Sequence, residues 1–237
     1  MREHLYSRFY FDELFPSLSH PSLRRMAEEQ FTRIGDTSIG TPGAGVSSLF
    51  IDSTSKIANL KDDTTGYRHN YFNKVTTASQ NVATTGRTYL TGSNVPIQVG
   101  KLQIGTRIQW TMNYTKTGAG SASSVFDICV GTAGTTADTA RVSFTKPAGT
   151  AVADEGRIII DCVCRGPLSA SGILAGHFNM THNLSATGHA VIPVVDVDAQ
   201  SAAFDVTVAS LIVGLCITAG ASDNVTFQWL AVEAWDI

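Results

Sequence analysis

The segment of this chain that most resembles a ligand-binding loop is CVGTAGTTADTARVSFT, residues 129–145, which combines glycines, threonines and one aspartate. A phosphate-binding loop needs glycines at fixed spacing, a helix directly after them, and usually a lysine followed by serine or threonine. Here the residues after the glycines, ARVSFT, alternate as a strand does, and no lysine directly follows the glycines. We therefore predict a strand–loop–strand connection in which Asp138 accepts hydrogen bonds from nearby backbone.

Three histidines, His177, His182 and His189, are the candidates for a metal site. Their separations of five and seven residues do not place all three on one face of a strand, and no acidic residue lies between them. We therefore expect histidines that are exposed or locally hydrogen-bonded, and no metal. Cys162 and Cys164 lack a second cysteine or histidine pair at ligand spacing, so we interpret the four cysteines as buried free thiols.

The acidic residues give no sign of catalysis. Asp196, Asp198 and Asp205 raise the question of calcium, but the pattern and closing glutamate of an EF-hand loop are absent. Asp127, Asp161 and Asp205 occupy polar or edge positions of predicted strands; a hydrolase with two carboxylates united by folding stays the weakest alternative. The sequence contains no Gly-x-Ser-x-Gly elbow and no cysteine in an activating setting. We expect no enzyme and no cofactor.

The composition excludes further classes of protein. The 237 residues are 43% hydrophobic and 16% charged, with a net charge of −3, and small residues are abundant. Scarce charged helix formers favour short strands over helices. Nucleic-acid binding needs a concentrated basic surface, and the sequence contains no run of Lys and Arg. The longest apolar segment, residues 208–220, is too short to cross a bilayer, and no signal peptide is evident, so we expect a soluble cytoplasmic product that binds neither nucleic acid nor membrane.

Residues 67–237 are predicted to form an antiparallel, jelly-roll-like β-sandwich. The clearest strand lies at residues 107–115, where apolar and polar residues alternate. Its apolar side carries Ile108, Trp110, Met112 and Tyr114. Turn residues recur between several such segments, and βαβ alternation is absent. Residues 158–163 and 211–217 are apolar on both faces, which packing within the sandwich or against a neighbouring subunit explains equally.

The first 66 residues differ from the rest of the chain. Residues 1–47 are predicted to form an arm, a helix and a linker rich in Gly and Ser, and residues 48–66 a small connecting hairpin. The helix has Pro21 in its first turn and ends at Gly35. Its apolar stripe is formed by Leu23, Met26, Ala27, Phe31 and Ile34. The fold class is therefore mainly β, preceded by a short helical arm.

The arm before this helix is rich in aromatic residues. They are Tyr6, Phe9, Tyr10, Phe11 and Phe15. One short helix cannot bury so many rings, so the arm either packs against the main domain or docks on another subunit or a larger assembly, since aromatic anchors dominate interfaces. Under the second interpretation, the docking residues are these five aromatics together with Leu23 and Phe31.

Three segments of the chain resemble virion structural proteins of tailed bacteriophages. They are SLFIDSTSKIANLKDDTTGYRHNY, TYLTGSNVPIQVGKLQIGTRIQWTMNYTKTGAGSASSVFDICVGTAGTTADTARVSFT and GLCITAGASDNVTFQWLAVEAW, and the resemblance covers residues 48–237. It implies a non-enzymatic capsid decoration protein, head fibre or tail fibre component, usually a homotrimer, with a β-sandwich displayed after a short N-terminal region. Its partner would be the major capsid protein or another virion protein, and its location the virion, assembled in the host cytoplasm.

The alternative is a receptor-binding or carbohydrate-binding module of the phage tail. Sandwich loops can bind sugars, and the side chains of Trp110, Trp229 and Trp235 can stack on a sugar ring. Because all three tryptophans lie within predicted strands, we predict that they are buried in the core instead.

Overall fold

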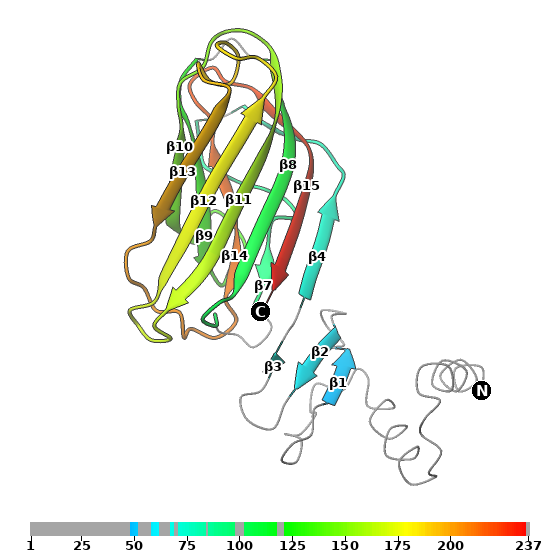
Figure 1. Ribbon diagram of the computed structural model, residues 1–237, viewed down its shortest axis with the longest axis vertical. Coiled ribbons are helices and arrows are strands. Elements are labelled where there is room, and N and C mark those ends of the chain that lie inside the picture. Colours follow the sequence, from blue (N-terminus) through cyan, green and yellow to red (C-terminus); the bar gives the residue numbers. More distant parts are fainter. Residues whose placement is uncertain are drawn as a thin grey trace, which may run out of the picture. The chain divides into compact units, whose positions relative to one another are not determined.

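The computed structural model describes residues 48–51, 58–61, 67–68, 71–83, 85–97, 102–117 and 121–235, whose regular structure is entirely β-strand (Figure 1). The chain divides into two compact units, Met1–Arg68 and His69–Ile237. The predicted helix and the aromatic arm lie outside the described residues. No helix among the described residues is long and apolar enough to cross a membrane.

The described part of the first unit is a small antiparallel sheet. Its strands are β1 (Ser48–Ile51), β2 (Ala58–Lys61) and β3 (Tyr67–Arg68), in that order. β1 and β2 form a hairpin in which Ser48 pairs with Lys61 and Ile51 with Ala58. The residues that connect the two strands, 52–57, lie outside the described part of the chain.

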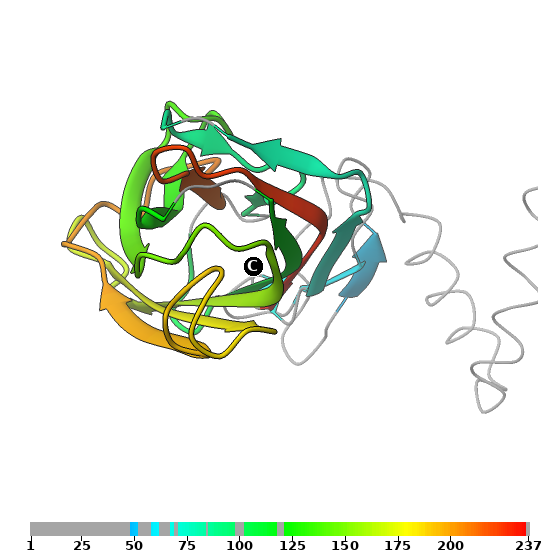
Figure 2. The same cartoon turned by 90° about the horizontal axis from the view of Figure 1, so that it is seen from above.

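The second unit is a sandwich of two antiparallel sheets, which confirms the prediction of a mainly antiparallel β-sandwich (Figures 1 and 2). The seven-stranded sheet runs β13 (Val194–Gln200), β12 (Ile173–His182), β11 (Asp154–Gly166), β8 (Arg107–Lys116) and β15 (Val225–Trp235), with β4 (Tyr71–Thr76) and β5 (Gln80–Val82) both pairing with β15. The five-stranded sheet runs β10 (Thr139–Lys146), β9 (Ser124–Gly131) and β14 (Ile212–Thr218), with β6 (Thr88–Tyr89) and β7 (Val95–Pro96) both pairing with β14.

The core lies between the two sheets and follows the alternation of the strands. Successive side chains of a strand point to opposite faces, so every second residue of β8 is available to the core. The predicted inward residues of β8 are all buried: Ile108, Trp110, Met112 and Tyr114. Those of β9 are buried as well: Phe126, Ile128 and Val130. Full burial of a side chain of this size contributes about 1.5–3 kcal/mol, so this pattern fixes which face of each strand turns outward.

Aromatic side chains join the two sheets at the centre of the core. Phe178 of β12 contacts Phe126 of β9 and Phe144 of β10, with ring centroids 5.1 and 5.7 Å apart. Phe227 of β15 meets Phe126 edge to face at 6.4 Å. Such tilted and stacked pairs add about 0.5–1.5 kcal/mol each beyond the area they bury. The rings therefore fix the distance and alignment of the sheets.

The glycine-rich segment is the β9–β10 connection, as predicted. Both oxygens of the Asp138 carboxylate accept backbone hydrogen bonds, from the N–H of Ala133 at 3.0 Å and of Gly134 at 2.8 Å. The carboxylate thereby satisfies two backbone N–H groups of the turn. The segment is thus a structural loop rather than a phosphate-binding one.

A buried ionic cluster holds together the end of the sandwich at which β11 begins. The Lys116 ammonium, 1% exposed, donates to the carbonyl of Thr150 and lies 3.9 Å from the Asp223 carboxylate. The Lys146 ammonium, 2% exposed as a residue, donates to the carbonyls of Pro147 (2.9 Å) and His189. Buried ammonium groups satisfied in this way tie loops from both sheets to each other.

The Lys146 ammonium makes the stability of this end dependent on pH. Burial lowers the pKa of Lys146 from 10.5 to about 8, with Lys116 adding to the decrease and Asp223 opposing it. The folded chain therefore releases this proton at lower pH than the unfolded chain does. Between pH 8 and 10.5 the unfolded state binds more protons, so this group makes the free energy of unfolding rise with pH.

We predict that the stability advantage of the wild type over Lys146→Met grows as the pH is raised from 7.5 to 10. The expected change is on the order of 1–3 kcal/mol, because the charged ammonium is costly to bury and the neutral amine is not. Urea unfolding at several pH values measures it, with the exposed-lysine variant Lys74→Met as a control. A difference between wild type and Lys146→Met that does not change with pH contradicts the prediction.

Candidate functional site

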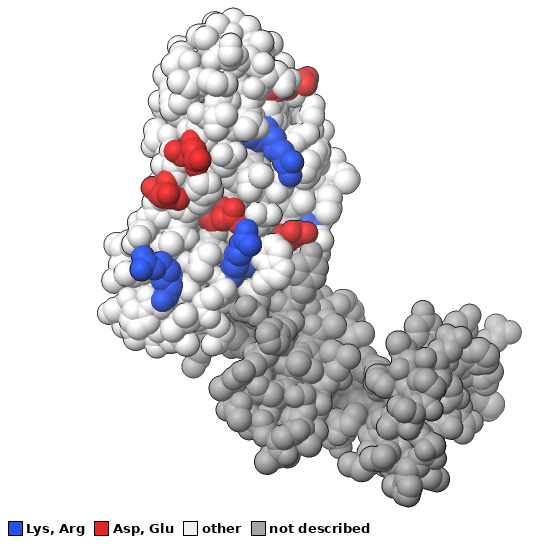
Figure 3. Space-filling view, viewed as in Figure 1, with Lys and Arg blue, Asp and Glu red and all other residues white. Residues whose placement is uncertain are grey.

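The outer face of the seven-stranded sheet is polar and carries charges of both signs (Figure 3). Near the C-terminal end of β15 its side chains engage one another. Arg107 donates to the Asp161 carboxylate at 2.9 Å and lies 5.2 Å from the ring centre of Trp235, and Gln109 donates to the same carboxylate at 3.0 Å. The hydrogen-bonding groups of this region are therefore largely used within the protein.

A second set of mutually engaged side chains lies on β12 and β13. The two ring nitrogens of His177 contact the carboxylates of Asp198 at 2.9 Å and Asp196 at 3.2 Å. Within the described part of the chain, no group of three or more His, Cys, Asp and Glu residues is arranged to hold a metal ion. The predicted calcium candidate Asp205 is not part of this set; it accepts hydrogen bonds from Thr207 in its own loop.

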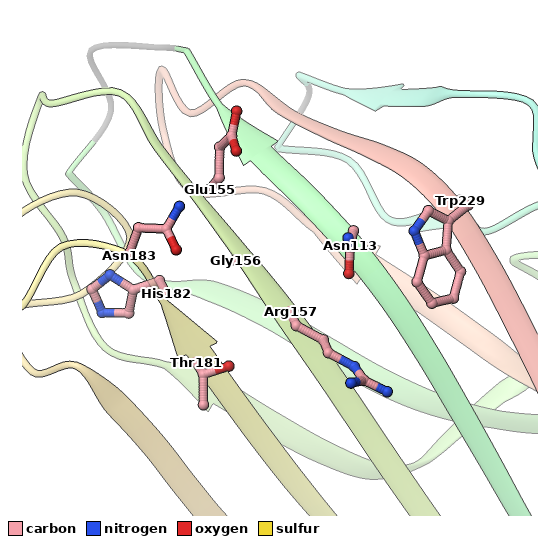
Figure 4. Close-up of a pocket in the computed structure, with 8 residues that line it drawn as sticks. All are labelled: Asn113, Glu155, Gly156, Arg157, Thr181, His182, Asn183 and Trp229. Atoms are coloured by element: carbon pink, nitrogen blue, oxygen red, sulfur yellow. The ribbon is translucent and has the colours of Figure 1, made fainter.

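Toward the other end of the same face the sheet bears a hollow of about 690 Å³ (Figure 4). It is lined by Asn113, Glu155, Gly156, Arg157, Thr181, His182, Asn183 and Trp229. The volume falls within the range of small-molecule sites, but the lining is mostly polar and carries one aromatic ring. This combination makes the hollow the candidate functional site.

Four of the lining residues form a row that crosses four neighbouring strands. Arg157 of β11 pairs with Thr181 of β12 on one side and with Asn113 of β8 on the other. Asn113 in turn pairs with Trp229 of β15. Since neighbouring strands lie about 4.8 Å apart, the row spans roughly 14 Å. The side chains of one continuous row thus come from four separate segments of the sequence.

A β-bulge at Gln228 turns Trp229 outward. The pairing of β15 with β8 shifts register between Phe227, opposite Tyr114, and Trp229, opposite Asn113, so that Gln228 is an extra residue. One extra residue reverses the faces, as bulges generally do when they re-aim a side chain. Phe227 is buried in the core, whereas Trp229 is half-buried on the outer face.

The bulge corrects the prediction that all three tryptophans are buried. Trp110 is fully buried, as predicted, and donates its indole N–H to the carbonyl of Ser93 at 2.8 Å. Trp229 and Trp235 are half-buried on the outer face instead. The reason is the phase of β15: its inward positions change from odd to even numbers at the bulge, so position within a strand alone does not indicate burial.

The polar groups of the row are free to bind a ligand. Within the described part of the chain, no hydrogen bond or ion pair engages the side chains of Arg157, Asn113 or Trp229. The side chains of Glu155 and Asn183 are free in the same sense. The hollow therefore offers donors, acceptors and an aromatic face together, in contrast to the mutually paired side chains elsewhere on the sheet.

His182 and Asp154 support one rim of the hollow. The His182 ring contacts the Asp154 carboxylate through Nδ1 and the carbonyl of Ile192 through Nε2, both at 2.6 Å. Asp154 also accepts from the backbone N–H of His189 and Glu155. Burial opposes ionisation of Asp154, but these hydrogen bonds outweigh it and lower its pKa. The carboxylate thus joins the rim of the hollow to the buried ionic cluster.

The structure brings two of the three candidate histidines together. The rings of His182 and His189 lie 6.2 Å apart, whereas His177 is on the outer face with its two aspartates. Burial lowers the pKa of His189 to about 3, so its ring is neutral, and it packs against Tyr114 with the ring centroids 3.9 Å apart and the planes tilted by 56°. His177 and His182 are hydrogen-bonded locally, as predicted. The prediction is wrong for His189, whose ring is buried and has no hydrogen-bond partner for either nitrogen among the described residues.

The remaining sequence-derived candidates do not contribute to the hollow. All four cysteines, including Cys162 and Cys164, are buried and free, which confirms their interpretation as buried thiols. The proposed docking residues lie outside the described residues: Tyr6, Phe9, Tyr10, Phe11, Phe15, Leu23 and Phe31. The site residues Arg157, Thr181 and Glu155 were not singled out from the sequence, where they appear only as polar positions of strands.

No protein-family model matches the chain, and no curated protein sequence matches it. Its backbone is loosely similar to arcelin-5, a lectin-like defense protein from Phaseolus vulgaris, with 8% identity and a TM-score of 0.34 over 81% of this chain and 92% of that one. A lectin from Bauhinia forficata in complex with GalNAc is similar with 9% identity and a TM-score of 0.27, over 81% of this chain and 92% of that one. The CBM2 module of the evolved Dit of Lactobacillus casei BL23 phage J-1 is similar with 7% identity and a TM-score of 0.25, over 84% of this chain and 83% of that one. Similarities this weak carry no argument about what this chain binds.

Proposed function

We propose that this protein is a non-enzymatic module of a tailed-bacteriophage virion whose β-sandwich binds a carbohydrate through the hollow on the seven-stranded sheet. The observation that carries the binding role is the row Thr181–Arg157–Asn113–Trp229, in which free polar groups accompany a half-exposed aromatic ring. The virion setting rests on the resemblance of residues 48–237 to phage structural proteins.

The chemistry of the row suits a sugar. An indole ring stacks on the apolar C–H face of a pyranose, while amide and guanidinium groups bind its hydroxyls. A row that spans roughly 14 Å across the sheet provides room for an extended oligosaccharide rather than a compact ligand. Asn113 lies beside Trp229 in the row, so one sugar residue can contact both.

The lining of the hollow argues for binding without hydrolysis. Glycoside hydrolysis uses a pair of carboxyl groups that flank the scissile bond. Glu155 is the carboxylate that lines the hollow, and the neighbouring Asp154 is buried and already hydrogen-bonded to His182 and backbone N–H groups. The paired arrangement is therefore missing from the described lining.

A second candidate function is decoration of the capsid as a homotrimer anchored by the N-terminal region. The observation that favours it is a group of exposed apolar residues at the start of β13, where Val191, Ile192 and Val194 are 54%, 45% and 45% exposed. Consecutive exposed apolar side chains are typical of a surface that contacts another protein chain. In this function the major capsid protein or another virion protein binds residues 1–35, and the sandwich contacts its own copies.

For the binding role, Trp229→Ala is expected to reduce affinity for a bound oligosaccharide by about tenfold or more, because the stacking surface is lost. A glycan array with the purified chain identifies the ligand, and calorimetry measures the affinity. Trp235→Ala is the matched control, since Trp235 lies on the same strand and face but outside the hollow. Absence of glycan binding by the wild type, or equal losses in the two variants, contradicts the proposal.

For the anchoring role, deletion of residues 1–35 is expected to leave the sandwich folded but to abolish attachment to purified particles. Co-sedimentation with particles measures attachment, and thermal unfolding followed by circular dichroism shows whether the sandwich persists. Quantitative mass spectrometry of intact virions then separates the two settings: tens to hundreds of copies indicate the capsid, and about a dozen indicate the tail. A truncated chain that still attaches shows that the anchor lies elsewhere.

A further inference from the structure

We infer that the hollow selects a carboxylated sugar residue, a uronic acid or a similar acidic sugar, whose carboxylate binds Arg157. This inference rests on the proposed carbohydrate-binding function and adds a substrate class to the same site. It follows from the charge state of Arg157, from its position in the row and from the direction of its side chain.

Arg157 is an exposed cation that has no counterion among the residues the structure describes. Elsewhere on the same face Arg107 lies 2.9 Å from Asp161, and His177 contacts Asp196 and Asp198. Arg165 of β11, like Arg157, has no ion pair within the described part of the chain, but it lies outside the hollow. No carboxylate within the described part of the chain forms an ion pair with Arg157. A guanidinium group presents parallel N–H donors that match both oxygens of a carboxylate. Its natural partner is therefore an anion that comes from outside.

The neighbours of Arg157 place this anion on the sugar. Arg157 is two strands from Trp229, about 10 Å at normal strand spacing, with the amide of Asn113 between them. The flexible Arg157 side chain extends along the sheet into the hollow (Figure 4). A sugar ring that stacks on Trp229 can therefore direct its carboxylate toward the guanidinium while its hydroxyls reach Asn113.

The charges around the hollow favour a singly charged anionic group next to Arg157. Glu155 lies two residues from Arg157 on β11 and lines the same hollow, but the two side chains point in opposite directions (Figure 4). One guanidinium can neutralise a carboxylate, whereas a doubly charged phosphate next to Glu155 would keep unbalanced negative charge. Carboxylated sugars therefore fit the site better than phosphorylated ones.

The test compares oligogalacturonate with its methyl ester, which has the same sugar backbone without the negative charge. We expect the wild-type chain to bind the acidic form roughly tenfold to a hundredfold more tightly, since hydrogen bonds to a charged group contribute about 1.5–3 kcal/mol. Arg157→Gln should remove this preference, so that the acidic form and the ester bind with similar affinity. Arg157→Lys, which keeps the charge but loses the paired donors, should retain a part of it.

Arg165→Gln is the control, because Arg165 is an exposed arginine of β11 outside the hollow.

The outcomes separate the inference from the function on which it rests. Binding of neutral and acidic oligosaccharides with equal affinity, unaffected by Arg157→Gln but weakened by Trp229→Ala, overturns the inference and keeps carbohydrate binding. Failure to bind any oligosaccharide, in the glycan array and in this comparison of acid and ester, overturns both the inference and the proposed carbohydrate binding. Stronger binding of a sugar phosphate than of the carboxylate also overturns the inference.

Discussion

The structure depends on the two-residue period of its long strands, because each strand of the seven-stranded sheet must turn one set of side chains to the five-stranded sheet and the other set to the outside. The aromatic contacts of Phe178 with Phe126 and Phe144 fix the inner set. Because the alternate residues of β8 and β11 are buried on the inner face, Asn113 and Arg157 lie on the outer face. The binding row is therefore a consequence of the core rather than an addition to it.

The hollow combines this regularity with one departure from it. The bulge at Gln228 lets β15 keep Leu230 and Val232 in the core while it moves Trp229 from the inner face to the outer one. At the same end of the sandwich, Asp154 connects His182, at the rim, to backbone groups beside the buried lysines. The polar groups lining the hollow are thus supported by a buried carboxylate that is hydrogen-bonded to His182 and to two backbone N–H groups.

Much of the fold follows from the sequence, because alternation is a local property. The inward residues of β8 and the Asp138-closed loop are predictable from residue type and spacing alone. The position of Trp229 on the outer face could not be predicted in this way, because it depends on a register shift against a partner strand more than a hundred residues away. A signal does exist in NVTFQWLAVEAW: apolar residues at 225 and 227 change phase to 230, 232 and 234. The row itself depends on which strands become neighbours, which local patterns do not reveal.

The origin of the row in four strands has a consequence for how such a protein changes over generations. Asn113 lies between two buried residues, and Arg157 and Thr181 each have one buried neighbour in the strand, Ile158 and Met180 respectively. None of the three row residues is part of the core. A substitution at any one of them changes the surface of the hollow at little cost to folding, since exposed strand positions tolerate replacement. The chemistry of the hollow can therefore diverge one residue at a time while the scaffold stays constant.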